Sequence, residues 1–340
     1  MKNHGASVYD FTRNRTVVVL ANPCFDALKC SSGSQRESEL AVTLSRNGGE
    51  SWSVPRRLSE LCADCAALTA YVPPGNGLLL TVGPHRGRLL FVAQQGTNTG
   101  NRVIYSDDGG GSSKLSTTTV PDCNEAQMVQ LTNGSLLMNA RVESGTGPHP
   151  VGLQGTRRFS TSDDGGVTWS NGAIRRDFDH TNCMGSTMSA SATGIGMSTL
   201  LFAHPNNGSC CNDNGLCGMK YCNPCCDNRA NGTVWMSSDG GANFSPVFDV
   251  VDPRALYAYS DLVRMPAAAG KNKLFGLLYE TGDEGRCVGP SCKIVFRTFS
   301  IKADDDEART GDSGGSRASL RRSTPLDSTI RGCGCVQRAH

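Results

Sequence analysis

The 340-residue sequence has few aromatic and charged side chains, which make up 6% and 19% of it. Its net charge is only +2, and its lysines and arginines are scattered along the chain. A surface that binds nucleic acid needs concentrated basic residues, so no nucleic-acid partner is expected. No apolar run approaches the roughly 18 residues of a membrane-spanning helix, so no transmembrane segment is expected either.

Helical periodicity of useful length is also missing. A secretory leader is not found either, because no apolar segment follows residues 1–5. The six histidines are scattered and fit no metal-binding pattern, so we expect neither a metal nor another cofactor. His85 is interpreted as a loop residue rather than a catalyst.

Glycine and cysteine, by contrast, are abundant. The 40 glycines predict many turns between short strands. Sixteen cysteines are too many for an ordinary cytosolic enzyme, and six of them lie between Cys210 and Cys226. Adjacent cysteines such as Cys210 and Cys211 favour a disulfide-stapled loop over a structural zinc site, which is the alternative. Cys62 and Cys65 form another close pair.

Five Asn-x-Ser/Thr sequons agree with a secretory route, which would lead to a lysosome or to the outside of the cell. They start at Asn14, Asn133, Asn207, Asn231 and Asn243. Because these features of an oxidising compartment occur without a leader, we expect the natural N-terminus to lie upstream of residue 1.

One short motif occurs four times, at intervals of 56 to 75 residues. Its form is Ser-x-Asp/Asn-Gly-Gly-x-x-Trp/Phe; it occupies residues 45–52, 162–169 and 237–244, and a copy at 106–110 lacks the aromatic residue. The Asp or Asn side chain can accept hydrogen bonds from nearby backbone N–H groups, and glycine allows positive φ. The motif therefore predicts a repeated hairpin turn.

Short apolar or alternating runs surround these turns and fall into five sets of about four strands. Four-stranded units repeated radially predict an all-β fold, the β-propeller. We expect this propeller to occupy residues 1–302, with a cysteine-rich loop insertion at 207–226. Residues 303–340 are rich in Gly, Ser and Arg and are expected to be disordered.

The repeated turn resembles the Asp-box of the sialidase (neuraminidase) family, and other stretches resemble that family, in the same order, over residues 6–301. In residues 124–141 Glu125 opens one strand and Arg141 closes the next. Arg229 precedes the last Asp-box. Tyr259 lies in residues 258–262, and Glu280 ends the stretch 276–280. Residues 83–89 are similar to a segment of bacterial and lysosomal-type sialidases.

This resemblance implies a six-bladed propeller that removes terminal α-linked sialic acids from glycoproteins, oligosaccharides or gangliosides, with retention of configuration. It implies that Tyr259 is the nucleophile and Glu125 its general base. Arg141 and Arg229 become two of three arginines that bind the substrate carboxylate. Glu280 becomes the carboxylate that orients the remaining arginine.

The chemistry of sialic acid explains these residue types. Its anomeric carbon carries a carboxylate, which would repel a carboxylate nucleophile; a neutral phenol avoids this repulsion. The pKa of a free phenol is about 10, so Tyr259 needs a base such as Glu125 to become nucleophilic at neutral pH. Guanidinium groups suit the substrate carboxylate because they are planar, always charged and bidentate.

Each residue also has a plainer interpretation when taken alone. A tyrosine beside a strand is usually a half-buried packing residue, and a lone Arg or Glu usually lies on a solvated face. The functional interpretation depends on the five residues occurring together in the order of the family.

The resemblance has one gap. The family begins with a strand carrying an Arg-Ile-Pro motif, followed by a loop with the acid/base aspartate, and neither is found here. Arg13, Arg15, Asp10 and Asp26 lack the expected context. We therefore expect five of six blades, two of three arginines, and doubtful activity for this chain alone.

Three functions remain open. The first is an exo-α-sialidase. The second is a sialic-acid-binding propeller without turnover, in which the same residues form a lectin site. The third is a propeller that serves protein–protein contact, with the Asp-boxes as scaffold only.

Overall fold

The computed structural model describes residues 5–21, 40–65, 70–95, 100–143, 156–178, 183–191, 198–206, 229–252, 255–265, 273–282, 293–301 and 328–330. The cysteine-rich segment 210–226 lies outside the described residues. The same is true of residues 303–340 apart from a short strand at 328–330, which falls within the range for which the sequence predicts disorder. No helix in the described ranges is long and apolar enough to span a membrane.

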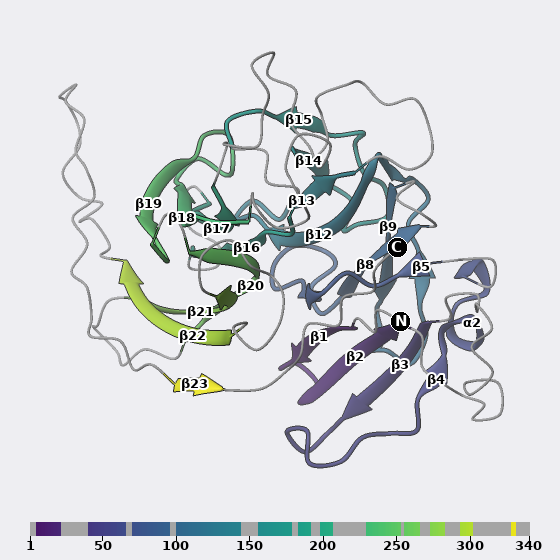
Figure 1. The fold of residues 1–340 in the computed structure, drawn as a ribbon. Coiled ribbons are helices and arrows are strands. Elements are labelled where there is room, and N and C mark those ends of the chain that lie inside the picture. Colours follow the sequence, from purple (N-terminus) through teal and green to yellow (C-terminus); the bar gives the residue numbers. More distant parts are fainter. Residues whose placement is uncertain are drawn as a thin grey trace, which may run out of the picture.

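The described residues form five β-sheets that follow one another around a common centre, which confirms the propeller (Figure 1). The first contains β1 (Gly5–Asp10), β2 (Arg15–Ala21), β3 (Leu40–Ser45), β4 (Arg56–Arg57) and β6 (Gly75–Asn76). The second contains β5 (Ala70–Tyr71), β7 (Leu78–Leu79), β8 (Leu89–Gln95), β9 (Gly100–Ser106), β10 (Lys114–Leu115) and β11 (Val120–Pro121).

The third sheet contains β12 (Cys123–Gln130), β13 (Leu136–Val142), β14 (Arg157–Ser162) and β15 (Ala173–Arg175). The fourth contains β16 (Ser186–Ser189), β17 (Leu200–Pro205), β18 (Gly232–Ser237) and β19 (Ser245–Asp249). The fifth contains β20 (Leu256–Arg264), β21 (Lys273–Gly282), β22 (Lys293–Ile301) and β23 (Ser328–Ile330).

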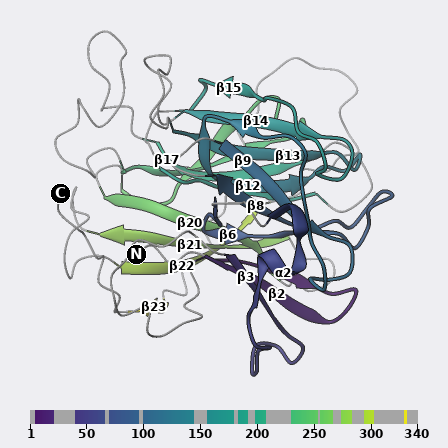
Figure 2. The same cartoon turned by 90° about the vertical axis from the view of Figure 1, so that its right-hand side faces the viewer.

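Neighbouring sheets, or blades, pack face to face, and Figure 2 shows them stacked from the side. β16 contacts both β12 and β20, so the first strands of the third, fourth and fifth blades lie next to one another. Every residue of β13 is buried, on both faces of the strand. A strand between two blades is covered on both sides, which explains why Leu136, Leu137 and Met138 follow one another without alternating with polar residues.

The four predicted turns are present and share one pattern of hydrogen bonds. In the third blade, Ser162 Oγ donates to Asp164 Oδ1 at 2.9 Å, and the Gly166 N–H donates to Ser162 Oγ at 2.9 Å. The Thr168 N–H also donates to Asp164 Oδ1, at 2.9 Å. Both glycines have positive φ, 69° at Gly165 and 89° at Gly166, which a side chain would strain.

Arginine side chains join each of three turns to the preceding blade. Arg15 of the first blade donates to the carbonyl of Gly109 at 3.3 Å, Arg88 to Gly165 at 3.0 Å, and Arg175 to Gly241 at 2.7 Å. The turn of the first blade differs, because a Cβ on Gly49 would meet only Trp52 of the same turn, whereas a Cβ on Gly241 would lie 2.9 Å from Leu137 of the preceding blade. Trp52 in that turn is 46% exposed, whereas its counterpart Trp169 is 5% exposed.

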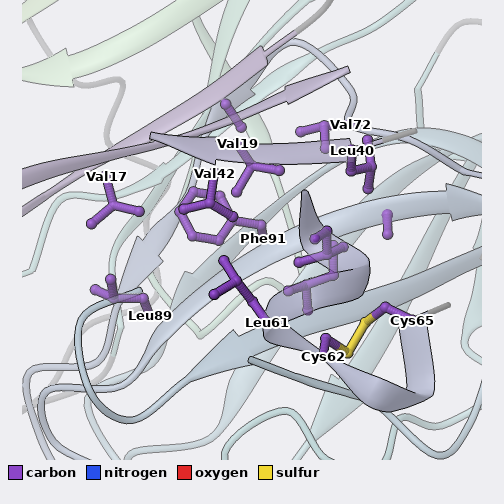
Figure 3. Close-up of a cluster of buried hydrophobic side chains, with 14 of the residues drawn as sticks. Val17, Val19, Leu40, Val42, Leu61, Cys62, Cys65, Val72, Leu89 and Phe91 are labelled. Atoms are coloured by element: carbon purple, nitrogen blue, oxygen red, sulfur yellow. A yellow bond between two sulfur atoms is a disulfide. The ribbon is translucent and has the colours of Figure 1, made fainter. Parts of the chain in front are cut away.

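Apolar clusters fill the spaces between blades. Figure 3 shows the one between the first two blades, where Val17, Val19 and Val42 meet Leu89 and Phe91. A short helix, α2 (Leu58–Leu61), and the 3-10 turn η1 (Ala63–Cys65) close this cluster. Cys62 and Cys65 form a disulfide there, as the disulfide interpretation of the cysteines predicts for this pair.

Candidate functional site

Glu125 lies near the start of β12, where the strand is irregular. The pairing of β12 with β13 shifts register between Cys123 and Ala126, so the residues between them form a β-bulge. A bulge bends the strand and re-aims its side chains, and such bulges are common beside active sites. The Glu125 side chain is thereby buried at the common centre of the blades, the hub, and the residue is only 8% exposed.

Tyr259 also lies in a bulge. The pairing of β20 with β21 shifts register between Tyr257 and Ser260. In this bulge the Tyr259 N–H donates a hydrogen bond to the Glu280 carboxylate on β21. Burial raises the pKa of Glu280, although this N–H group and the nearby Arg229 guanidinium act in the opposite direction.

The two bulged residues meet directly. The Tyr259 hydroxyl donates to Glu125 Oε1 at 2.6 Å, between residues 134 positions apart. Burial raises the pKa of Glu125, but the Arg141 guanidinium, this hydrogen bond and Arg229 outweigh it and hold the pKa below its usual value. Burial and the Glu125 charge raise the pKa of Tyr259. The proton therefore rests on the phenol, opposite an ionised carboxylate.

Arg141, at the end of β13, completes the arrangement. Its Nη1 donates to Glu125 Oε2 at 2.7 Å, and its Nη2 lies 2.6 Å from Glu143 Oε2. The residue is 6% exposed, and the two carboxylates hold its pKa above the ordinary value despite burial. A guanidinium has five N–H donors, enough for two side-chain carboxylates and a substrate carboxylate together.

Arg229 reaches the same place from the segment before β18. Its Cζ lies 5.4 Å from the centre of the Tyr259 ring, a cation–π arrangement. Its backbone carbonyl accepts the Tyr257 N–H at 2.8 Å, which ties this segment to β20. The structure therefore brings together all five residues singled out from the sequence: Glu125, Arg141, Arg229, Tyr259 and Glu280.

Sequence reasoning missed Arg157, a fully buried guanidinium directly across from Arg141 in the β13–β14 ladder. Arg157 donates to Asn139 Oδ1 at 2.7 Å and to the carbonyl of Cys183 at 3.2 Å. Burial, followed by the like charge of Arg141, lowers its pKa. It adds positive charge behind Glu125. Nothing in the local sequence signals this, because Arg157 occupies a strand position like those of its neighbours.

Other residues considered from the sequence lie elsewhere. Asp10 accepts hydrogen bonds from Thr12 and Arg13 within one hairpin, and these hold its pKa below the usual value despite burial. His85 packs against Gly165 in the turn of the third blade, a loop position. Asp26 lies outside the described residues. No cluster of three or more potential metal ligands occurs in the described ranges.

Fold and site together define a class: an Asp-box β-propeller whose central strands carry a tyrosine–glutamate pair flanked by arginines. A family model described as a BNR repeat-like domain matches residues 15–271. The chain belongs to the sialidase family of BNR-repeat proteins.

Proteins named as sialidases are similar to this chain over most of its length. A sialidase from Bacteroides fragilis is 26% identical over 251 residues, which are 72% of this chain and 40% of that protein. A sialidase from Micromonospora viridifaciens is 27% identical over 248 residues, 71% of this chain and 33% of that protein. The chain thus spans less than half the length of these curated relatives.

Solved structures show the same fold. The intramolecular trans-sialidase from Ruminococcus gnavus is 25% identical, with a TM-score of 0.52 over 72% of this chain and 46% of that one. The NanB sialidase from Streptococcus pneumoniae is 19% identical, with a TM-score of 0.58 over 82% of this chain and 52% of that one.

Proposed function

We propose that the protein is an exo-α-sialidase that hydrolyses terminal α-linked sialic acids with retention of configuration. Tyr259 is the nucleophile, Glu125 its general base, and Arg141 and Arg229 bind the substrate carboxylate. The observation that carries this proposal is the 2.6 Å hydrogen bond from the Tyr259 hydroxyl to Glu125. The substrates are the sialylated ends of glycoproteins, oligosaccharides or gangliosides.

In the first step the Tyr259 oxygen bonds to the anomeric carbon, the glycosidic C–O bond breaks, and the phenolic proton passes to Glu125. With the pKa of Tyr259 raised and that of Glu125 lowered, proton transfer before attack is unfavourable. The transfer becomes favourable as the new bond forms, because the phenolic oxygen then loses electron density and its proton becomes acidic. We therefore propose that attack and proton transfer are concerted.

The leaving oxygen also needs a proton, and no residue of this chain matches the family's acid/base aspartate or its first arginine by motif. We propose that both groups must be added to the 340 residues for full activity. General acid help contributes roughly 10²–10⁴-fold, and the need for it falls as the leaving group becomes more acidic. The chain alone should therefore cleave aryl sialosides slowly and alkyl-linked sialosides barely.

The test compares an aryl and an alkyl α-sialoside, with residues 1–340 and with a longer product of the same reading frame. The expected result is slow release of the aryl group by residues 1–340, and cleavage of both substrates by the longer form. NMR of the first sugar formed should show the α-anomer. Tyr259→Phe should abolish turnover in both forms. Efficient cleavage of the alkyl sialoside by residues 1–340 would refute the need for further groups.

The second candidate is a lectin, and the missing acid is the observation that favours it. A chain without a proton donor but with the carboxylate-binding arginines would hold a sialoside without cleaving it. Calorimetric titration with an alkyl α-sialoside separates the two functions. Binding that Arg141→Ala abolishes, with no turnover of either substrate in either form, would favour the lectin.

We also propose a secretory destination, lysosomal or extracellular. The disulfide between Cys62 and Cys65 supports it, because such bonds persist in oxidising compartments. Fractionation of the natural source cells, with glycosidase treatment to detect N-linked sugars, tests this destination.

A further inference from the structure

A second pair of side chains crosses the hub beside Tyr259 and Glu125. Gln127 lies two residues after Glu125 on β12, and Asp261 lies two residues after Tyr259 on β20. Gln127 Nε2 donates to Asp261 Oδ1 at 3.2 Å. Gln127 and Asp261 therefore form a second contact between β12 and β20, two positions further along each strand than Glu125 and Tyr259.

Asp261 accepts more than this one hydrogen bond. Asn76 Nδ2 lies 3.0 Å from Asp261 Oδ1 and 2.8 Å from Oδ2. Ser186 Oγ, on β16 between the two strands, lies 3.4 Å from Asp261 Oδ1 and donates to Gln127 Oε1 at 3.1 Å. Side chains from three other segments of the chain, β6, β12 and β16, therefore converge on this carboxylate.

The backbone around Ser186 and Gln127 is tied into the same network. Ser186 Oγ accepts the Leu262 N–H at 2.8 Å, and Gln127 Oε1 accepts the Thr187 N–H at 2.8 Å. Gly75 has a φ of 126°, and a Cβ there would lie 2.3 Å from Gln127 Nε2. Strand β6, which carries Asn76, can approach this closely only because residue 75 is glycine.

The position of this network relative to the bulges determines what it can do. Regular pairing resumes at Ala126 in β12 and at Ser260 in β20, directly before Gln127 and Asp261. Glu125 and Tyr259 lie in the bulges themselves, where the ladder is interrupted and holds the backbone less firmly. Among the described residues, Gln127 and Asp261 connect β12 and β20 directly after the two bulges.

We propose that Asp261, with Gln127 and Asn76, is a positioning group that holds the Tyr259 hydroxyl at hydrogen-bonding distance from Glu125. This inference rests on the proposed roles of Tyr259 and Glu125 in the reaction. Asp261 itself touches no reacting atom. Its loss should lower kcat and leave the KM for a sialoside nearly unchanged, because a shift of about 1 Å in a reacting group costs about 10²-fold in rate.

Asp261→Asn tests the proposal with little change in size. Asn76 Nδ2 contacts both oxygens of Asp261, so either orientation of the new amide places an NH2 group against another NH2 group. The double variant N76D/D261N exchanges donor and acceptor: the new amide can donate to the carboxylate at position 76 and still accept from Gln127. This double variant is the rescue.

Two readouts keep the proposal distinct from the proposed function. The first is the kcat and KM for an aryl α-sialoside. The second is the ¹³Cζ NMR signal of Tyr259 in a chain labelled at tyrosine, assigned by its loss in Tyr259→Phe. We expect Asp261→Asn to lower kcat about 10- to 100-fold, and to move the signal toward its position in Glu125→Gln. The double variant should restore most of the kcat and return the Tyr259 signal most of the way to its wild-type position.

The control is Asp163→Asn, an exposed carboxylate in the turn of the third blade, which should change neither readout. An unshifted Tyr259 signal in a folded Asp261→Asn chain would overturn the proposal. So would a double variant whose kcat and Tyr259 signal stay at the values of Asp261→Asn. If Tyr259→Phe retains full turnover while the signal still responds to Asp261→Asn, the proposed function fails and the positioning contact stands.

Discussion

Replacing Glu125 by glutamine tests the tyrosine–glutamate pair most directly. The amide keeps the shape of the side chain but cannot take the proton of Tyr259. Its NH2 group must also face either the Tyr259 hydroxyl or the Arg141 guanidinium, because one carboxylate oxygen contacts each of them, at 2.6 Å and 2.7 Å. A conservative change therefore removes the base and disturbs one of two buried hydrogen bonds.

The size of the effect follows from these two losses. Loss of a general base lowers the rate roughly 10²- to 10⁴-fold, or about 3–5 kcal/mol in the barrier. Removing one partner of a buried ion pair costs up to about 3–5 kcal/mol of stability, but Glu143 still neutralises Arg141. We therefore expect a stability loss at or below the lower end of that range.

The assay is hydrolysis of an aryl α-sialoside across pH, with urea denaturation in parallel. The pKa of Glu125 is lowered, so its stabilisation is present above the unfolded value of about 4.3 and is lost as pH falls through the lower folded value. Glu125→Gln should lack this acid-side loss of stability. Glu60→Gln, an exposed carboxylate on α2, is the control. Turnover of Glu125→Gln within threefold of wild type, with an unchanged pH profile, would refute the reasoning.

Three further changes test the scaffold, two by chemical denaturation and one by the yield of folded chain. Arg175→Ala removes the link to the Gly241 carbonyl and should cost about 1.5–3 kcal/mol, and a loss under 0.5 kcal/mol would argue against the arginine links. Gly232→Ala would place a Cβ 2.2 Å from the Tyr257 ring and should reduce the yield of folded chain, whereas folding like wild type would contradict this packing. Cys62→Ser opens a four-residue loop and should cost about 2 kcal/mol, and an unchanged unfolding midpoint would show that the disulfide adds nothing.

The blade pattern was predictable because it depends on residues that are close together in the sequence. Each Asp-box turn is made by side chains within a few residues of one another, as Ser162 and Asp164 show. The strands between turns are short apolar or alternating runs, a pattern typical of β-strands. The five sheets and their order followed from these local signals.

The arginine links between blades could not be predicted in this way. Arg15, Arg88 and Arg175 reach carbonyl groups 94, 77 and 66 residues away. Every residue has a backbone carbonyl, so the sequence does not indicate which carbonyl an arginine will contact. For the same reason, the sequence did not reveal that Arg157 lies buried behind Glu125.

The repeat and the propeller follow from the sequence alone, because turn chemistry is a local property, and the order of the motifs singled out five residues that the structure brings together. Tertiary packing, in contrast, sets three contacts: the hydrogen bond from Tyr259 to Glu125, the one from the Tyr259 N–H to Glu280, and the meeting of side chains from β6, β12 and β16 at Asp261. These contacts depend on where the register of two strands shifts. Such a shift reflects packing around the hub rather than the preference of any one residue.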